Sequence, residues 1–254
     1  MKNVIVIPVL NEEKHILEVL EKTEKSVETK DIIYVVDNDS TDNSIALIKE
    51  KFPEVKIIQE KKRGKGNAIR LGFEAALLHK PEFVTMIDGD GEKDPEDIPV
   101  LVKTAKASGA DMIIGRRVAS RSLRREILKR FENFWLRYAT GFDVKDGSSG
   151  FNVILAESLK KMTLVSEEFE IEPEIILECR KNSMTVLEHP IKTPLFSPTK
   201  VSLTHILEIN GFFDRWVLDW IGNRDCDLPI MKKISLKIFC SLGLLIFGSN
   251  KNQK

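Results

Sequence analysis

The feature that most constrains the fold is a regular alternation of short apolar runs with longer segments of helical pattern across residues 4–114. Most of the runs are wholly or almost wholly apolar, as expected for strands that helices cover on both faces. Strands that alternate with helices of this length indicate βαβ units and an α/β fold with a mostly parallel sheet. The predicted strands are 4–7, 32–36, 55–58, 83–87 and 112–114, and the predicted helices are 12–25, 42–51, 65–79 and one opened by Pro95.

Length and charge set the broad class. A chain of 254 residues, 42% of them hydrophobic, can bury one sizeable core or a core with an appendage. Its formal net charge of zero argues against electrostatic binding of nucleic acid. No internal repeat or low-complexity linker occurs before Gly222. We therefore expect one domain over residues 1–222, followed by a tail over residues 223–254.

Two aspartates, Asp88 and Asp90, follow directly after the apolar run at 83–87. Ligands of open α/β sheets bind outside the carboxyl ends of the strands, so both carboxylates are expected at a site. Two oxygen ligands there suit Mg²⁺ or Mn²⁺, which commonly keep other positions for water and substrate phosphates. The alternative is a simple turn, since Asp-Gly pairs are common in turns.

Two other predicted strands also lead into segments with polar residues, Pro-Val-Leu-Asn-Glu at 8–12 and a run of polar residues at 37–42. Asp37 is placed to accept hydrogen bonds from a nucleobase or ribose. Ser40 or Thr41 could instead cap the next helix. A glycine-containing segment at 63–68 enters the helix predicted to begin near Lys65, and the N-terminus of such a helix favours phosphate or carboxylate.

These segments, together with Gly-Arg-Arg at 115–117 and Asp-Gly-Ser-Ser-Gly-Phe at 146–151, fall in the order seen in family-2 inverting glycosyltransferases of the GT-A fold. The chain most resembles the polyprenyl-phosphate branch, typified by dolichyl-phosphate mannose and glucose synthases. The resemblance implies a Rossmann-like sheet and metal-dependent, inverting transfer of a sugar from a UDP- or GDP-linked donor to a polyprenyl phosphate. Transfer to a saccharide hydroxyl and a non-catalytic nucleotide-sugar-binding regulator are the alternatives.

The resemblance also implies roles for individual residues. Glu92 stands where this branch often has a glutamine metal ligand, and Asn38 stands where many relatives have a second aspartate. Mg²⁺ or Mn²⁺ would be held by Asp88, Asp90 and Glu92, and the donor nucleotide by Pro8, Asn11, Glu12, Asp37, Asp39, Lys65, Asp88 and Lys200. Catalysis would fall to Asp90, Asp146 and Arg117, and the lipid phosphate would meet Arg117, Arg125, Arg130 and Ser149.

The acceptor decides whether a general base is needed. A lipid phosphate is already an anionic nucleophile at neutral pH, so no strong base would be required. A saccharide hydroxyl would call for a positioned carboxylate, and Glu170, Glu172 and Glu174 are candidates. These glutamates also suit the acidic first turn of a helix with Pro173 near its start.

Two amphipathic helices are expected, at about 120–138 and 203–221, with aromatic residues spaced three and four apart and, in the first, basic residues between them. Such helices lie in membrane interfaces or pack their apolar side on a sheet. The tail combines lysines with an apolar run at 238–247 and could associate with a membrane or cover an apolar patch. We expect a peripheral protein on the cytoplasmic membrane face, whose sugar, nucleotide, lipid length and oligomeric state the sequence does not specify.

Overall fold

The structure, a computed structural model, describes residues 2–118 and 123–192 of the chain. The chain divides into two units, Met1–Glu208 and Ile209–Lys254, and all the described residues lie in the first. Lys200, the helix expected at 203–221 and the tail lie outside the described residues. They stay predictions, as does the expected boundary at residue 222.

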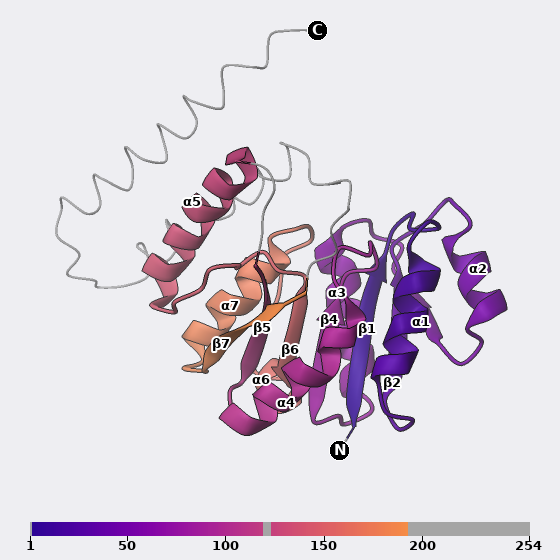
Figure 1. Cartoon of the computed structure of the whole chain (residues 1–254), viewed down its shortest axis with the longest axis horizontal. Coiled ribbons are helices and arrows are strands. Elements are labelled where there is room, and N and C mark those ends of the chain that lie inside the picture. Colours follow the sequence, from indigo (N-terminus) through magenta and orange to yellow (C-terminus); the bar gives the residue numbers. More distant parts are fainter. Residues whose placement is uncertain (1, 119–122, 193–254) are drawn as a thin grey trace, which may run out of the picture. The chain divides into compact units, whose positions relative to one another are not determined.

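The described part of the chain is built on one sheet of seven strands (Figure 1). The strands are β1 (Asn3–Val9), β2 (Ile32–Asp37), β3 (Lys56–Gln59), β4 (Phe83–Ile87), β5 (Met112–Arg117), β6 (Phe151–Leu155) and β7 (Val186–Ile191). Their order across the sheet is β3-β2-β1-β4-β6-β5-β7. Strand β6 runs antiparallel to both of its neighbours, and the other pairings are parallel. The expected α/β class with a mostly parallel sheet is confirmed.

Helices follow most of the strands. They are α1 (Ile16–Ser26), α2 (Ser44–Lys51), α3 (Lys65–Leu77), the short 3-10 helix η1 (Pro95–Asp97), α4 (Ile98–Ser108), α5 (Leu123–Thr140), α6 (Ala156–Leu159) and α7 (Ile171–Lys181). Helix α1 contacts α2 and α4, whereas α3 and α5 both contact α7. Pro95 opens η1, which leads directly into α4, and α5 corresponds to the first expected amphipathic helix.

The two faces of the sheet pack against different helices. Successive side chains of a strand point to opposite faces, and in β1 Ile5 and Ile7 belong to the apolar cluster that includes Leu20 of α1. Val6 points the other way, towards α3, where a Cβ atom at Gly72 would overlap its side chain. Glycine at this position lets α3 pack closely on β1. Helices therefore cover both faces, which explains the continuously apolar strands.

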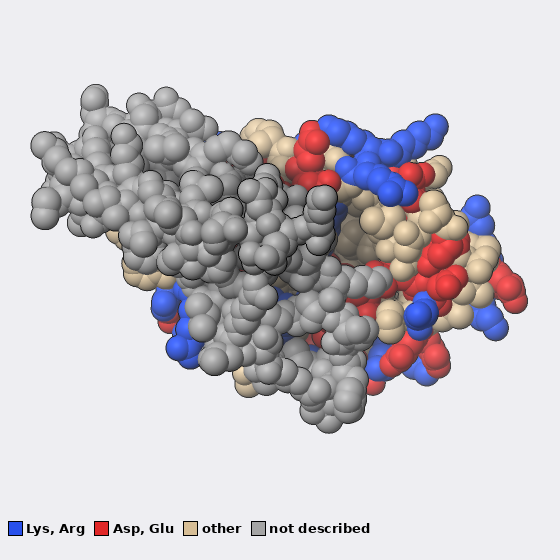
Figure 2. Space-filling view, turned by 90° about the horizontal axis from the view of Figure 1, so that it is seen from above, with Lys and Arg blue, Asp and Glu red and all other residues tan. Residues whose placement is uncertain are grey.

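The carboxyl ends of the six parallel strands lie at one edge of the sheet, the upper edge in Figure 1. Because β6 is antiparallel, its first residue pairs with the end of β4, through Phe151 opposite Ile87. The loop that precedes β6 therefore reaches the same edge. Figure 2 views the molecule from this side and shows both acidic and basic side chains on the described part of the chain. Within residues 2–118 and 123–192, no helix is long and apolar enough to cross a membrane.

Candidate active site

Asp88, directly after β4, is the centre of a buried group of charges. Its Oδ1 lies 2.7 Å from Lys65 Nζ and its Oδ2 lies 2.5 Å from Lys93 Nζ. Lys65 Nζ also lies 2.5 Å from Glu172 Oε1. Burial alone would raise the pKa of Asp88, but the two ammonium charges outweigh burial and hold the pKa well below its usual range. Asp88 is therefore an ionised carboxylate with an ammonium on each oxygen.

Gly150 is required by the position of Asp88. The Asp88 N–H donates to the Gly150 carbonyl at 3.1 Å, because β4 and β6 meet here. A Cβ atom on residue 150 would overlap the Asp88 carboxylate. The glycine in the Ser149-Gly150-Phe151 turn thus lets the antiparallel strand pass beside the ion pairs. Ser149 is buried, and its hydroxyl donates to the Gly115 carbonyl at 2.6 Å.

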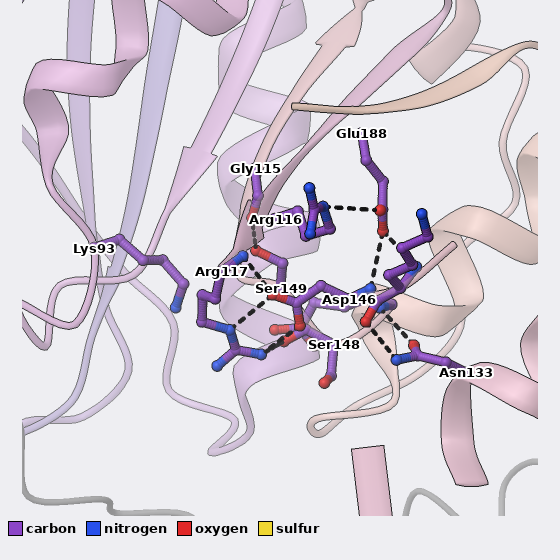
Figure 3. Close-up of polar contacts among 12 residues, drawn as sticks. Lys93, Gly115, Arg116, Arg117, Asn133, Asp146, Ser148, Ser149 and Glu188 are labelled. Atoms are coloured by element: carbon purple, nitrogen blue, oxygen red, sulfur yellow. Dashed lines mark hydrogen bonds and ion pairs between the residues drawn. The ribbon is translucent and has the colours of Figure 1, made fainter. Parts of the chain in front are cut away.

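A second ion pair joins Arg117, at the end of β5, to the fully buried Asp146 (Figure 3). The guanidinium donates to both carboxylate oxygens, from Nε at 2.9 Å and from Nη2 at 2.8 Å. The Arg117 backbone N–H also donates to Asp146, at 2.8 Å. Burial would lower the pKa of Arg117, but Asp146 raises it above its ordinary value. Paired, bidentate contacts of this kind fix the plane of the guanidinium.

Two side chains from other elements hold the loop that carries Asp146. Glu188 of β7 accepts two consecutive N–H groups of the loop, at 2.6 and 2.9 Å, and lies 3.4 Å from Arg116 Nε. Asn133 of α5 donates to the Lys145 carbonyl at 2.6 Å and accepts the Gly147 N–H at 2.9 Å. Figure 3 shows both side chains reaching the loop. The Asp146 carboxylate is therefore positioned from β7 and α5 together.

The segments after β1 and β2 are tied into one unit. Asn11, with a φ of 57°, accepts the N–H groups of Thr41 and Asp42 through its side-chain oxygen, at 2.8 and 3.2 Å. Asp37 accepts the Ser40 N–H at 3.0 Å, and the Glu12 N–H donates to the Ser44 hydroxyl at 2.8 Å. The left-handed backbone at Asn11 and Asp39 is a conformation that asparagine and aspartate tolerate. Pro8 lies in β1, next to these segments.

Asn38 fixes the entry to α3. Its side-chain oxygen accepts the Gly64 N–H at 2.7 Å, and its amide nitrogen donates to the Lys62 carbonyl at 2.9 Å. An aspartate could accept the first bond but could not donate the second. Gly64 has a φ of 131°, and Cβ atoms at Gly64 or Gly66 would overlap the backbone before α7. This close approach brings Lys65 within reach of Glu172.

The three glutamates considered as bases have different surroundings. Glu172 is ion-paired with Lys65, and burial, the largest influence, raises its pKa. Glu174 accepts the N–H groups of Val165 and Ser166 at 2.9 and 3.0 Å, so it holds the loop before α7. Glu170 precedes the first turn of α7. Only Glu172 of the three is thus part of the Asp88 cluster.

Glu132 of α5 is a buried carboxyl that belongs to none of the expected motifs. Burial, followed by the negative charge of Asp146, raises its pKa to about 7. Arg117 opposes this rise, and Glu172 adds to it. A group that titrates near neutrality thus lies close to both ion pairs.

The sequence matches the family model for glycosyl transferase family 2 over residues 4–162. The chain belongs to glycosyl transferase family 2. An uncharacterized protein of Methanocaldococcus jannaschii is 34% identical to this glycosyltransferase over 74% of the chain and 80% of the relative. A UDP-N-acetylglucosamine–dolichyl-phosphate N-acetylglucosaminyltransferase of Methanococcus voltae is 26% identical over 74% and 84%. A polyprenol monophosphomannose synthase of Mycolicibacterium smegmatis is 26% identical over 75% and 76%.

Among solved structures, glucosyl-3-phosphoglycerate synthase from Mycobacterium tuberculosis, in complex with Mn²⁺, UDP and phosphoglyceric acid, has the same fold. Its TM-score is 0.68 at 19% identity, over 84% of this glycosyltransferase and 78% of that chain. The expected GT-A fold is therefore confirmed. The family match and the named relatives likewise confirm that the chain is an enzyme rather than a non-catalytic regulator.

The expected metal ligands of the glycosyltransferase fit Mg²⁺ or Mn²⁺ in their donor chemistry, because Asp88, Asp90 and Glu92 all offer carboxylate oxygens. Asp90 uses its Oδ1 to accept the Glu92 N–H at 2.9 Å. Within the described residues, no three histidine, cysteine or carboxylate side chains converge as a metal site. Their assignment as ligands stays a prediction.

The structure brings many of the expected site residues together and leaves others apart. Close to the ends of β4, β5 and β6 it brings together five of them: Asp88, Lys65, Arg117, Asp146 and Ser149. Arg130 is exposed, and the side chain of Arg125 lies outside the described part of the chain. Four residues of the site were not predicted from the sequence, because they stand in no recognisable motif: Lys93, Glu132, Asn133 and Glu188.

Proposed function

We propose that this glycosyltransferase moves a sugar from a nucleoside diphosphate sugar to a polyprenyl phosphate, with inversion at the anomeric carbon. The observation that carries the proposal is the arrangement of cations at the ends of β4 and β5. Lys65 and Lys93 are both ion-paired with Asp88. Arg117 is ion-paired with Asp146. Such preorganised charge suits a reaction in which both the leaving group and the acceptor are phosphates.

The donor would bind at the ends of β1, β2 and β4. The linked segments at Asn11 and Asp37 would hold the nucleoside, and the diphosphate would lie towards Asp88 and Lys65. Mg²⁺ or Mn²⁺, held by Asp88, Asp90 and Glu92, would neutralise charge on the leaving diphosphate. Lys65 adds positive charge at the same place, which lowers the barrier further because the site is buried.

The acceptor would bind at the ends of β5 and β6. Arg117 has five N–H donors, of which the contacts to Asp146 and Ser148 use three. The remaining donors can orient the acceptor phosphate. Its oxygen attacks the anomeric carbon as the bond to the donor diphosphate breaks. An anionic phosphate brings no proton to remove, which agrees with the engagement of Glu172 and Glu174 in other contacts.

A lipid acceptor would bring the reaction to a membrane surface, which we propose to be the cytosolic face. Helix α5 supports this, since Phe134 and Tyr138 are exposed on it, 52% and 42% respectively, and Arg130 and Arg137 are exposed between and beside them. Aromatic and basic side chains together favour an interfacial position.

The test is to incubate the enzyme with labelled UDP and GDP sugars and a polyprenyl phosphate, and to measure label extracted into organic solvent. Asp90→Asn and addition of chelator are each expected to remove most transfer, because Lewis-acid stabilisation supplies on the order of several kcal/mol. Lys103→Met, an exposed position on α4, is the matched control. Label that enters only water-soluble saccharide would contradict the proposed acceptor.

Transfer to a saccharide hydroxyl is the second candidate, favoured by Glu132. A carboxyl with a pKa of about 7 suits a general base. If the acceptor is a hydroxyl, Glu132→Gln is expected to lower turnover about 10²- to 10⁴-fold. If the acceptor is a phosphate, turnover with saturating substrates stays within a few-fold of the parent, apart from its pH dependence.

A further inference from the structure

Lys93 is a buried lysine in the loop after β4, with 2% of its surface exposed. Lysine is almost never fully buried unless it is paired. Its partner among the described residues is Asp88, whose Oδ2 lies 2.5 Å from the ammonium. Figure 3 shows the side chain extending from its loop towards Arg117. Lys93 is thus ion-paired with the carboxylate that we propose to bind the metal, and it extends towards the proposed acceptor side.

The charges around Asp88 balance in the absence of substrate. Asp88 and Glu172 contribute two negative charges, and Lys65 and Lys93 contribute two positive charges at ion-pair distance. A donor diphosphate alone would add negative charge to this buried group, and a divalent ion alone would add positive charge. The proposed ligands Asp90 and Glu92 would offset part of the charge of the ion, whereas a diphosphate that binds without the ion is unfavourable in a site of low dielectric constant.

Direct coordination of Asp88 would place a divalent cation beside two ammonium groups, and their repulsion favours the departure of one of them. Mg²⁺ binds carboxylate oxygens at about 2.0–2.1 Å, and both oxygens of Asp88 already have an ammonium within 2.7 Å. Lys65 is also ion-paired with Glu172, so it keeps a negative partner when a metal ion binds Asp88. Lys93 has no second carboxylate among its ion pairs in the described residues. Lys93 is therefore the ammonium that can leave at lower cost.

We propose that Lys93 occupies Asp88 as a counter-ion until a divalent cation displaces it, and that the released ammonium then contacts the donor diphosphate. This inference rests on the proposed nucleoside diphosphate donor. It makes Lys93 a donor-binding residue and couples the binding of ion and nucleotide. The ion and the released ammonium together offset the negative charge that the diphosphate brings.

The test is calorimetric titration of Mn²⁺ into the metal-free enzyme, with no sugar or acceptor present. Lys93→Met is expected to bind Mn²⁺ at least about tenfold more tightly than the parent, which corresponds to about 1.4 kcal/mol, because no ammonium competes for Asp88. Lys93→Arg keeps the charge and is expected to bind like the parent. Lys103→Met is the control for loss of a surface lysine.

A second titration uses UDP and GDP with Mn²⁺ present. The parent is expected to bind one of them more tightly with the ion than without it, and Lys93→Met is expected to lose most of this gain. Should Lys93→Met fold poorly, Lys93→Gln takes its place with the same expectations, since its amide can still donate to Asp88.

Mn²⁺ binding by both uncharged variants that is no tighter than in the parent would overturn the exchange. Tighter binding by Lys93→Arg would also overturn it, because charge would then not be the cause. Failure of both nucleotides to bind the parent with Mn²⁺ would refute the proposed donor and the second half of the exchange. The Mn²⁺ titration alone would still decide whether Lys93 competes with the ion.

Discussion

Replacing Glu132 with glutamine should change how the stability of the enzyme depends on pH. In the folded chain the pKa of Glu132 is about 7, against an ordinary value of 4.5. Between these values the folded chain binds the proton that the unfolded chain has lost, so stability falls as the pH rises. The loss begins near the unfolded pKa and is complete above the folded one.

The magnitude follows from the two pKa values. One unit of pKa difference is worth 1.36 kcal/mol, and integration from pH 5 to pH 8 gives a loss of about 2.5 kcal/mol for this group. Glutamine does not titrate and keeps the shape of the side chain. The stability of Glu132→Gln relative to the parent should therefore rise by about 2.5 kcal/mol over this range, even though other carboxyls titrate in both proteins.

The assay is urea unfolding of both proteins at pH 5 and pH 8, with the free energy of unfolding extrapolated to water. Glu74→Gln, at an exposed position on α3, is the matched control and should show no such change. A difference between Glu132→Gln and the parent that is the same at both pH values would refute the argument. It would mean that Glu132 ionises in the folded chain as easily as in water.

Three further outcomes are expected. Asn38→Asp should lower the free energy of unfolding by about 1–3 kcal/mol, since the Lys62 carbonyl loses its donor; urea unfolding equal to the parent would contradict this. Gly150→Ala should cost about 1–3 kcal/mol and depress transfer, because its Cβ atom overlaps Asp88; unchanged stability and activity would show that β6 can shift. Arg117→Lys should reduce transfer about 10- to 100-fold through loss of a charge-assisted contact of about 1.5–3 kcal/mol, while calorimetry finds nucleotide affinity unchanged; an equal fall in nucleotide affinity would assign Arg117 to the donor.

The first half of the fold could be predicted from sequence because its strands are consecutive apolar runs separated by helices. Strand β6 was not predicted, because Phe151–Leu155 is a short segment interrupted by Asn152. Nothing in its residues encodes its antiparallel direction. Strand β7 alternates between buried and exposed positions only weakly and lies at the sheet edge. Its pairing with β5 depends on contacts far apart in the chain.

The same limit applies to the site. Asp88, Arg117 and Asp146 lie in recognisable motifs, so their proximity was expected. Glu172 and Glu174 are two residues apart in one helix, and only the packing of α7 decides that one meets Lys65 and the other meets backbone N–H groups. Lys93 and Glu188 are single charged residues whose roles come from burial beside distant partners, which local sequence does not report.

The place of β6 between two other strands has a consequence for motion at the site. This strand is hydrogen-bonded to β4 on one side and β5 on the other. Amide protons in its middle should therefore be among the slowest of the molecule to exchange with solvent. The loop carrying Asp146 leads directly into this strand. The part of the site that we propose for the acceptor is therefore attached to a rigid, central strand of the sheet. Changes of acceptor preference can then come from residues of the loop without softening the sheet that supports it.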